Sequence, residues 1–566
     1  MSRAMRYEGS RRRAGRKMTV ALVAVAAMVA AVPLLDLGEA SAETAAQPMV
    51  VDVDLTPNPV CSGPVSARIG VYHPAGVASR AQVEWRVRIG GGEARTGTVT
   101  MESSVETAEL PIEDARGELL VDVRTPGGTY GTPWRDRIGT GCDPVSVVSV
   151  GDSVVWDQGL AHDQKFPRLL GERLGAATGR GYRHHDYSIS GAVLDAPDLP
   201  AGNNDAACLD ERYPQDPDGD GEMELGEVTQ QMPDVFCQLE RARANAQQSG
   251  EKVDLVVLNG CINDLDPFLG IVAGITPGSE NVPAGVEREC SGVGALAENP
   301  ARNVPYFSGA KVGYGGRGMR AAIEKAHALP GRPKVLLVNF YYALSRASLP
   351  VMRTQCENAG LAANQVPQCK GAVARGADRY EQYTRYSAEA YRQAAAAANA
   401  ASPDGSYAVA ADGLFTLDNA VLAADSKLWA NPTADPAFPL RKQACPELSA
   451  TVPQCLSAAI AHPDVAGAKQ YADNLVLNPA LRTWFDLPGG STAPVQVLEQ
   501  ISAEVTLQAP AGVTSGRYRW YFGDGTVAET TTPTAVHTYD SAGPNLPRVL
   551  VGSTLYEATE PVVVGG

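Results

Sequence analysis

Residues 145–154 read VSVVSVGDSV, and this stretch decides the fold. Its first six positions are a continuous run of valine and serine, which indicates a strand buried on both faces. The Gly-Asp-Ser that follows is typical of a tight turn, and a helix can begin soon after it. Ser153 would then lie at the carboxyl end of a buried strand, beside helix amides, where a nucleophile and an oxyanion donor are both needed. The tripeptide alone also occurs in ordinary turns.

The pattern continues outward over residues 143–487. Val253–Leu258 and Val335–Phe340 are two further β-branched, apolar runs. Helix-forming residues at helical spacing separate and follow these runs, in Pro233–Gln248, Gly316–Leu329 and Asp378–Ala401. Alternation of buried strands with helices predicts a doubly wound α/β domain, whose active site lies at the carboxyl ends of its strands.

Three further blocks follow Ser153 in an order that suits one site. Ser190-Gly191 places a glycine amide after the second strand-like run, and Asn263 offers a carboxamide donor after the third. His462 comes at the end of the domain, where its last helix begins. Each block has an ordinary interpretation by itself, as a strand-end cap or a surface turn. Their joint occurrence at the right strand ends favours a catalytic site.

Together these four blocks resemble the SGNH (GDSL) hydrolases. The resemblance implies a flavodoxin-like doubly wound parallel sheet for residues 143–487. It also implies that Ser153 is the nucleophile and His462 the general base. The amides of Ser153 and Gly191 and the side chain of Asn263 would form the oxyanion hole. Catalysis would need no cofactor, and the substrate would be a carboxylic ester.

The chain departs from the family pattern at two positions. Cys261 stands where the family usually has glycine, and Ala459 stands where it usually has the aspartate that orients the histidine. His462 would then be oriented by a backbone carbonyl, or by a carboxylate such as Asp152 or Asp412. A Ser-His dyad is the working hypothesis.

Two small all-β, immunoglobulin-like sandwiches are predicted to flank this domain. Residues 43–142 alternate apolar and polar side chains between Gly and Pro turns, which is typical of half-buried antiparallel strands. The composition of residues 488–494 indicates a linker. Residues 495–566 contain the segments Trp520–Gly525 and His537–Tyr539, which resemble the signatures of PKD modules.

A calcium loop is predicted between Asp216 and Glu227. The segment has oxygen side chains at positions 1, 3 and 5, glycine at position 6 and glutamate at position 12, as in the twelve-residue calcium loop. A solvated acidic loop is the alternative. The predicted structural Ca²⁺ site consists of Asp216, Asp218, Asp220, Glu222 and Glu227.

The N-terminus predicts export. Residues 1–42 combine a basic start, an apolar run over Thr19–Leu35 and the small-residue site Ala40-Ser41-Ala42, as in a signal peptide; an uncleaved anchor is the alternative. An even cysteine count in an exported chain favours disulfides over metal thiolates. We expect sequential pairing, although the sequence leaves other connectivities open: Cys61–Cys142, Cys208–Cys237, Cys261–Cys290, Cys356–Cys369 and Cys445–Cys455.

Charge restricts the possible partners. The formal net charge of -16 opposes binding to nucleic acid or to anionic lipid, and no membrane span is expected after signal cleavage. Frequent Arg, Ala and Gly are typical of a high-GC bacterial source. With the resemblance, these features predict a secreted serine esterase or lipase acting on a lipid or an acylated polysaccharide. A catalytically impaired cell-surface protein that binds carbohydrate or mediates adhesion is the rival hypothesis.

Overall fold

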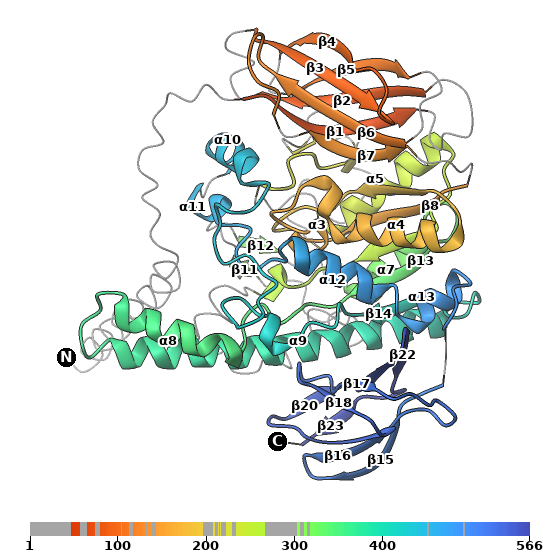
Figure 1. The fold of residues 1–566 in the computed structure, drawn as a ribbon, viewed down its shortest axis with the longest axis vertical. Helices are drawn as coiled ribbons and strands as arrows, with labels where there is room; N and C mark the ends of the chain where they lie inside the picture. The colour runs from red at the N-terminus through yellow and green to blue at the C-terminus, as the bar shows by residue number, and fades with distance from the viewer. Residues whose placement is uncertain are drawn as a thin grey trace, which may run out of the picture.

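The computed structural model stacks three parts of the chain along its long axis (Figure 1). A small β domain lies at the top of this view, an α/β domain in the middle and a second small β domain at the bottom. The structure describes residues 47–56, 65–73, 80–102, 105–112, 117–131, 133–138, 143–195, 208–209, 213, 215–216, 222–228, 234–265, 303–305, 311–313, 317–449, 452–490 and 493–565. The predicted signal peptide, residues 1–42, lies outside these ranges.

The middle domain is built on one five-stranded sheet in the order β14-β13-β10-β8-β9. All four neighbouring pairs run parallel. The predicted apolar runs form its central strands, and every residue of β8 and β10 is buried. The strands are β8 (Val145–Val150), β9 (Tyr182–Asp186), β10 (Leu255–Leu258), β13 (Lys334–Val338) and β14 (Ala408–Ala411).

Helices cover both faces of this sheet. α4 (Phe166–Thr178) contacts β8 and β9 and packs on α12 (Val465–Leu475). A second group, α5 (Val235–Ser249), α7 (Met319–His327) and α9 (Val366–Ala401), packs along β8, β10, β13 and β14. Aspartate caps begin α5 and α12, which satisfies backbone amides that the first helical turn leaves without partners.

Shorter elements complete the middle domain. The helices are α3 (Ser153–Trp156), α8 (Leu349–Asn358), α10 (Phe438–Leu448), α11 (Val452–Leu456) and α13 (Pro479–Trp484), with 3-10 turns at His162–Gln164, Asn263–Leu265, Arg346–Ser348 and Leu417–Asn419. A two-stranded ribbon pairs β11 (Asn303–Pro305) with β12 (Lys311–Gly313). None of the helices in the described part of the chain combines the length and apolarity that crossing a membrane requires.

The N-terminal domain consists of two antiparallel sheets around an apolar core. Alternation produces this core directly: along β3, Val83, Trp85 and Val87 point inward while their neighbours are more exposed. One sheet has the order β1-β2-β5 and the other β4-β3-β6-β7. The strands are β1 (Met49–Thr56), β2 (Val65–Tyr72), β3 (Gln82–Ile89), β4 (Arg95–Thr100), β5 (Val105–Ile112), β6 (Gly117–Arg124) and β7 (Trp134–Ile138).

The C-terminal domain also consists of antiparallel sheets, in the orders β15-β16-β19, β18-β17-β21-β22 and β20-β23. Trp520 is fully buried at its centre. The strands are β15 (Gln496–Ile501), β16 (Glu504–Gln508), β17 (Tyr518–Tyr521), β18 (Val527–Thr530), β19 (Thr534–Thr538), β20 (Gly543–Asn545), β21 (Arg548–Val551), β22 (Thr554–Glu557) and β23 (Val562–Val564).

The C-terminal domain is bound to the middle domain by partly buried polar contacts. Arg548 Nη1 lies 2.8 Å from Asp412 Oδ2, just beyond β14, and its Nε lies 2.5 Å from Glu557. Tyr342 Oη donates to the carbonyl of Gly523 at 3.2 Å. The composition of residues 488–494 indicated a linker. The structure shows in addition that the two domains on either side of these residues contact each other.

Three of the predicted disulfides are confirmed. Cys208–Cys237, Cys356–Cys369 and Cys445–Cys455 are bonded. Cys261 is also disulfide-bonded, and its partner lies outside the described residues, as do Cys61, Cys142 and Cys290.

Replacing Arg548 by leucine is expected to destabilise the C-terminal domain. The change leaves Asp412 and Glu557 without their shared cation, and because both carboxylates are 24% exposed the loss should cost about 1–3 kcal/mol, between the values for exposed and buried pairs. The matched control is Arg517→Leu, because the Arg517 side chain is 74% exposed and its pair with Glu529 is worth about 0–1 kcal/mol. Scanning calorimetry measures both variants, and equal shifts in Tm would contradict the expectation.

Candidate functional site

Ser153 lies at a turn that glycine makes possible. β8 ends at Val150, and Gly151 follows with φ +150°. A Cβ at Gly151 would overlap the side chain of Asn259, so a larger residue would displace the turn. The next residue, Asp152, caps α3 by accepting a hydrogen bond from Val154 N at 2.9 Å. Ser153 therefore begins a helix at the carboxyl edge of the sheet.

Two buried amide side chains hold this turn. Gln238 on α5 accepts from Gly151 N at 2.6 Å and donates to Gly151 O at 2.9 Å. Asn259, which follows β10, accepts from Asp152 N at 3.1 Å and donates to Asp152 Oδ1 at 3.2 Å. Neither residue was predicted from the sequence to have a role in the site. A fully buried glutamine on a helix is the signal for such a role, but burial could not be read from the sequence.

His462 reaches Ser153 from the other end of the domain. Its Nε2 lies 2.8 Å from Ser153 Oγ, and its Nδ1 lies 3.2 Å from the carbonyl oxygen of Ile460. A carbonyl oxygen only accepts, so Nδ1 carries the proton and Nε2 accepts from the serine hydroxyl. The arrangement can therefore remove the Ser153 proton.

The backbone around His462 is fixed by a second segment of chain. Trp429 N donates to His462 O and Ala461 N donates to Trp429 O, both at 2.8 Å. Burial lowers the pKa of His462 to about 4, although the hydrogen bond to Ile460 opposes this shift. The imidazole is consequently neutral near pH 7, as a general base must be.

The two carboxylates considered for orienting His462 have other partners. Asp152 bonds to Val154 N and Asn259, and burial raises its pKa to about 6. Asp412 pairs with Arg548 and accepts from Leu414 N. A backbone carbonyl, that of Ile460, is the group that contacts Nδ1 of His462.

Two of the residues expected to form an oxyanion hole, Gly191 and Asn263, lie close together. Gly191 has φ +83°, a conformation that favours glycine. Asn263 Nδ2 donates to the carbonyl of the adjacent Ala192 at 2.8 Å. A carboxamide nitrogen has two hydrogens, so this bond orients the group while a second hydrogen remains for a ligand.

The described members of the predicted calcium loop do not fit a common cation site. Each carboxylate pairs with a different side chain of the protein: Asp216 with Arg241, Glu222 with His185, and Glu227 with Arg441. Asp218 and Asp220 lie outside the described residues. Among the residues that the structure covers, no three His, Cys, Asp or Glu side chains are grouped as a metal site requires.

Comparison with known proteins defines the C-terminal domain. The family model of the PKD domain matches residues 491–549. Residues 491–549 are a PKD domain. In this PKD domain, His537 stacks on Phe522 at 4.0 Å and its Nε2 lies 2.9 Å from Asp524 Oδ2, so the signature residues bond to one another. No curated protein matches the chain.

The similar solved structures include glycoside hydrolases. A β-glucuronidase of Parabacteroides merdae with glycerol in its active site is 10% identical, with 91% of this chain and 63% of that chain covered and a TM-score of 0.20. A calcium-binding mutant of Bacteroides uniformis β-glucuronidase 2 is 9% identical, with 92% and 60% covered and a TM-score of 0.18. A glycosyl hydrolase family 2 member of Bacteroides cellulosilyticus is 7% identical, with 93% and 64% covered and a TM-score of 0.17. The chain thus spans less than two thirds of each.

These findings contradict several predictions. The structures named are glycoside hydrolases, not SGNH hydrolases, which corrects the flavodoxin-like SGNH fold class, the carboxylic ester hydrolase activity and the lipid or acylated-polysaccharide substrate. The rival adhesion hypothesis is set aside with them. Four short motifs fix a turn and one hydrogen bond, but they do not define a substrate pocket or a family. TM-scores below 0.5 carry no argument for a glucuronidase either.

The reactivity of Ser153 should fall only at a low pH, because the pKa of His462 is lowered. Only the neutral imidazole accepts the serine proton, so the rate of fluorophosphonate labelling should stay level from roughly pH 8 to 5 and fall as the pH drops through about 4. Mass spectrometry follows the label on Ser153, with circular dichroism at each pH to verify the fold. A midpoint near the ordinary imidazole pKa of about 6.5 would contradict the assignment.

Proposed function

We propose that this chain is an enzyme that works by covalent catalysis through Ser153, with His462 as its base. The observation that supports the proposal is the hydrogen bond of 2.8 Å between His462 Nε2 and Ser153 Oγ, with Nδ1 held by the Ile460 carbonyl. A nucleophile bonded to a base that a third group orients is the usual arrangement of an activated serine.

Ser153 and His462 together can carry out the proton transfers that the reaction needs. As Ser153 Oγ bonds to an electrophilic centre of the substrate, its proton passes to His462 Nε2, and His462 then protonates the leaving group. A second nucleophile then gives its proton to His462 Nε2 and bonds to the same centre, the bond of that centre to Ser153 Oγ breaks, and His462 returns the proton to Oγ. With water as that nucleophile, the enzyme is a hydrolase.

Charge that develops on the substrate oxygen would be stabilised by three donors. These are the backbone amides of Ser153 and Gly191 and the side chain of Asn263, as the sequence analysis expected. Donors that are already in place stabilise a transition state without the cost of reorganising solvent. The bond from Asn263 to Ala192 supports this role, because it fixes the carboxamide beside Gly191.

We also infer that the chain works outside the cell. The basic and apolar N-terminal segment with Ala40-Ser41-Ala42 supports export, and the three bonded disulfides are of a kind that persists in oxidising compartments. A calcium ion remains a prediction for such a compartment, although the described carboxylates do not favour it.

Replacing Ser153 by alanine should abolish fluorophosphonate labelling, because the label bonds to Oγ. His462→Ala should be nearly as severe, since a nucleophile and its base act as a unit. Asn263→Ala should slow labelling by about 10²- to 10³-fold. Ser457→Ala is the matched control: the Ser457 hydroxyl donates to the carbonyls of Pro453 and Gln454 in its own segment, so its removal should leave labelling unchanged. Label that persists in Ser153→Ala would refute the proposal.

The carboxylates near the site should be dispensable for orienting His462. Because Ile460 O contacts Nδ1, neither Asp152→Asn nor Asp412→Asn should approach the loss of about 10⁴-fold that follows neutralisation of a triad carboxylate. Labelling rates of the two variants, at matched folded fraction, measure this. A loss of that size in either variant would show that its carboxylate orients His462.

A further inference from the structure

Glu227 is a buried carboxylate whose partners lie just beyond Ser153. Its side chain is 2% exposed. Oε1 accepts from Trp156 Nε1 at 2.9 Å, and both oxygens accept from Gly159 N at 3.2 Å. Gln158 Nε2 donates to Oε2 as well. Glu227 thus fixes the loop that follows α3, the helix that Ser153 begins.

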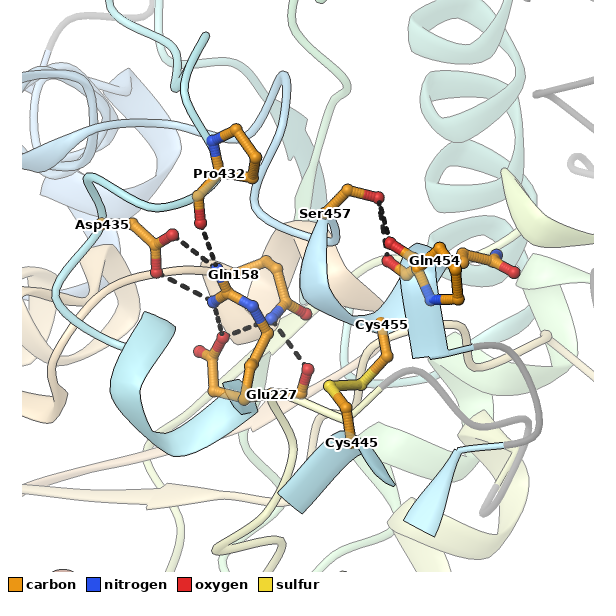
Figure 2. Close-up of a disulfide and its surroundings, with 10 residues drawn as sticks. Gln158, Glu227, Pro432, Asp435, Cys445, Gln454, Cys455 and Ser457 are labelled. Carbon is orange, nitrogen blue, oxygen red and sulfur yellow. Dashed lines mark hydrogen bonds and ion pairs between the residues drawn. A yellow bond between two sulfur atoms is a disulfide. The ribbon is translucent and has the colours of Figure 1, made fainter. Parts of the chain in front are cut away.

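The same carboxylate reaches the segment that leads to His462. Arg441 on α10 is fully buried, and its Nη1 lies 2.8 Å from Glu227 Oε2 and 2.8 Å from Asp435 Oδ1. Its Nη2 donates to Pro432 O at 3.2 Å. Figure 2 shows Glu227, Asp435, Pro432 and Gln158 converging on this point. The chain from Pro432 runs back within three residues to Trp429, which bonds to the backbone of His462.

The two segments touch directly where Glu227 binds. A Cβ added at Gly159 would lie 2.7 Å from Ala459 Cβ and 3.3 Å from Asp435 Cβ. Ala437 N donates to Gly159 O at 3.2 Å. Ala459 precedes His462 by three residues, and the Cys445–Cys455 disulfide joins α10 to α11 just before it (Figure 2). The loop after the nucleophile is therefore packed on the loop before the base.

The backbone beside Glu227 also contacts the segment of Gly191. Gly226 O accepts from Ser190 N at 3.2 Å, and a Cβ at Gly226 would lie 2.7 Å from the ring of Trp156. One short piece of chain, residues 226–227, thus contacts the segments of Ser153 and Gly191 directly and reaches the segment of His462 through Arg441.

We propose that Glu227 and Arg441 are positioning residues that hold Ser153 and His462 at hydrogen-bonding distance, and that Glu227 is not a calcium ligand. The inference rests on the proposed function of Ser153 and His462. A calcium loop needs the glutamate at position 12 as a bidentate ligand, with both oxygens on the ion. Here both oxygens accept from protein donors, and a calcium ion would leave Arg441 and Trp156 Nε1 buried without that acceptor.

Glu227→Gln is the main test variant. It keeps the shape of the side chain but removes the charge that Arg441 binds. Because misplacing reacting groups by about 1 Å can cost 10²-fold, fluorophosphonate labelling of Ser153 should slow by about 10- to 100-fold. The ¹⁵N shift of His462 Nε2 should also move toward the value of an imidazole nitrogen without a hydrogen bond.

Glu251→Gln is the matched control. Glu251 is a glutamate whose side chain is 9% exposed and lies 3.1 Å from both Arg183 and His185, but it contacts Ser146 at the amino end of β8, away from Ser153. The Glu251→Gln change should lower Tm, and it should leave the labelling rate of Ser153 and the ¹⁵N shift of His462 Nε2 unchanged. Equal slowing in the two variants would overturn the proposal, because loss of stability would then be the cause.

Arg441→Lys provides a second variant if Glu227→Gln does not fold. Lysine keeps the charge but cannot bridge Glu227 and Asp435 with one rigid fork, so labelling should again slow, by about 10-fold. Wild-type labelling in Arg441→Lys or in Glu227→Gln would overturn the proposal.

Calorimetric titration of the metal-free protein with Ca²⁺ is the independent measurement. Glu227→Gln should leave any calcium affinity as it is in the wild type, and its loss would overturn the proposal. The outcomes also separate the two hypotheses. A wild-type protein that takes no label at Ser153 refutes the proposed function, whereas the ¹⁵N shift of His462 in Glu227→Gln still decides the positioning role.

Discussion

A proton can pass between two side chains only if they are held at hydrogen-bonding distance, and here those side chains are 309 positions apart in the chain. The parallel sheet solves the first half of this problem, because β8 and the Gly151 turn fix Ser153 at its carboxyl edge. The second half is harder, because His462 lies in a loop without regular structure. Its position depends on the carbonyl of Ile460, the backbone of Trp429 and the packing of Ala459 on Gly159.

Burial determines the protonation state of His462. The imidazole of His462 is half-buried and burial favours its neutral form, while the group that contacts Nδ1 among the described residues is a neutral carbonyl, that of Ile460. A catalytic triad would have a carboxylate beside the histidine. Here the buried carboxylates Glu227 and Asp435 bind Arg441 instead. Ala459 is fully buried, and a Cβ added at Gly159 of the opposing loop would lie 2.7 Å from its Cβ, so the two loops pack closely at the position where the family has its carboxylate.

Local patterns in the sequence were sufficient for some features and insufficient for others. The valine-rich runs predicted the central strands, because burial on both faces leaves a direct compositional mark. The PKD signature and three cysteine pairs were also predicted correctly, because each depends on residues close in the chain. Ser153 and His462 could be proposed as partners, but the carbonyl that orients His462 has no side chain to identify it. The roles of Gln238, Asn259 and Arg441 depend on burial and on long-range contacts, which no short motif encodes. The calcium loop stays a prediction, and spacing alone does not tell whether a carboxylate such as Asp216 or Glu227 faces a metal or the guanidinium that it pairs with in the structure.

The contact between Gly159 and Ala459 also restricts how the chain can diverge. Position 159 has φ +100°, and a Cβ there would lie 2.7 Å from Ala459 Cβ and 3.3 Å from Asp435 Cβ, so it accepts no side chain unless these neighbours move. A larger residue at position 459 would in turn approach the backbone of Gly159. Related sequences should therefore change these two positions together, as a steric pair, even though they belong to opposite ends of the α/β domain. Such paired change would appear in an alignment as coevolution between two residues that carry no chemistry.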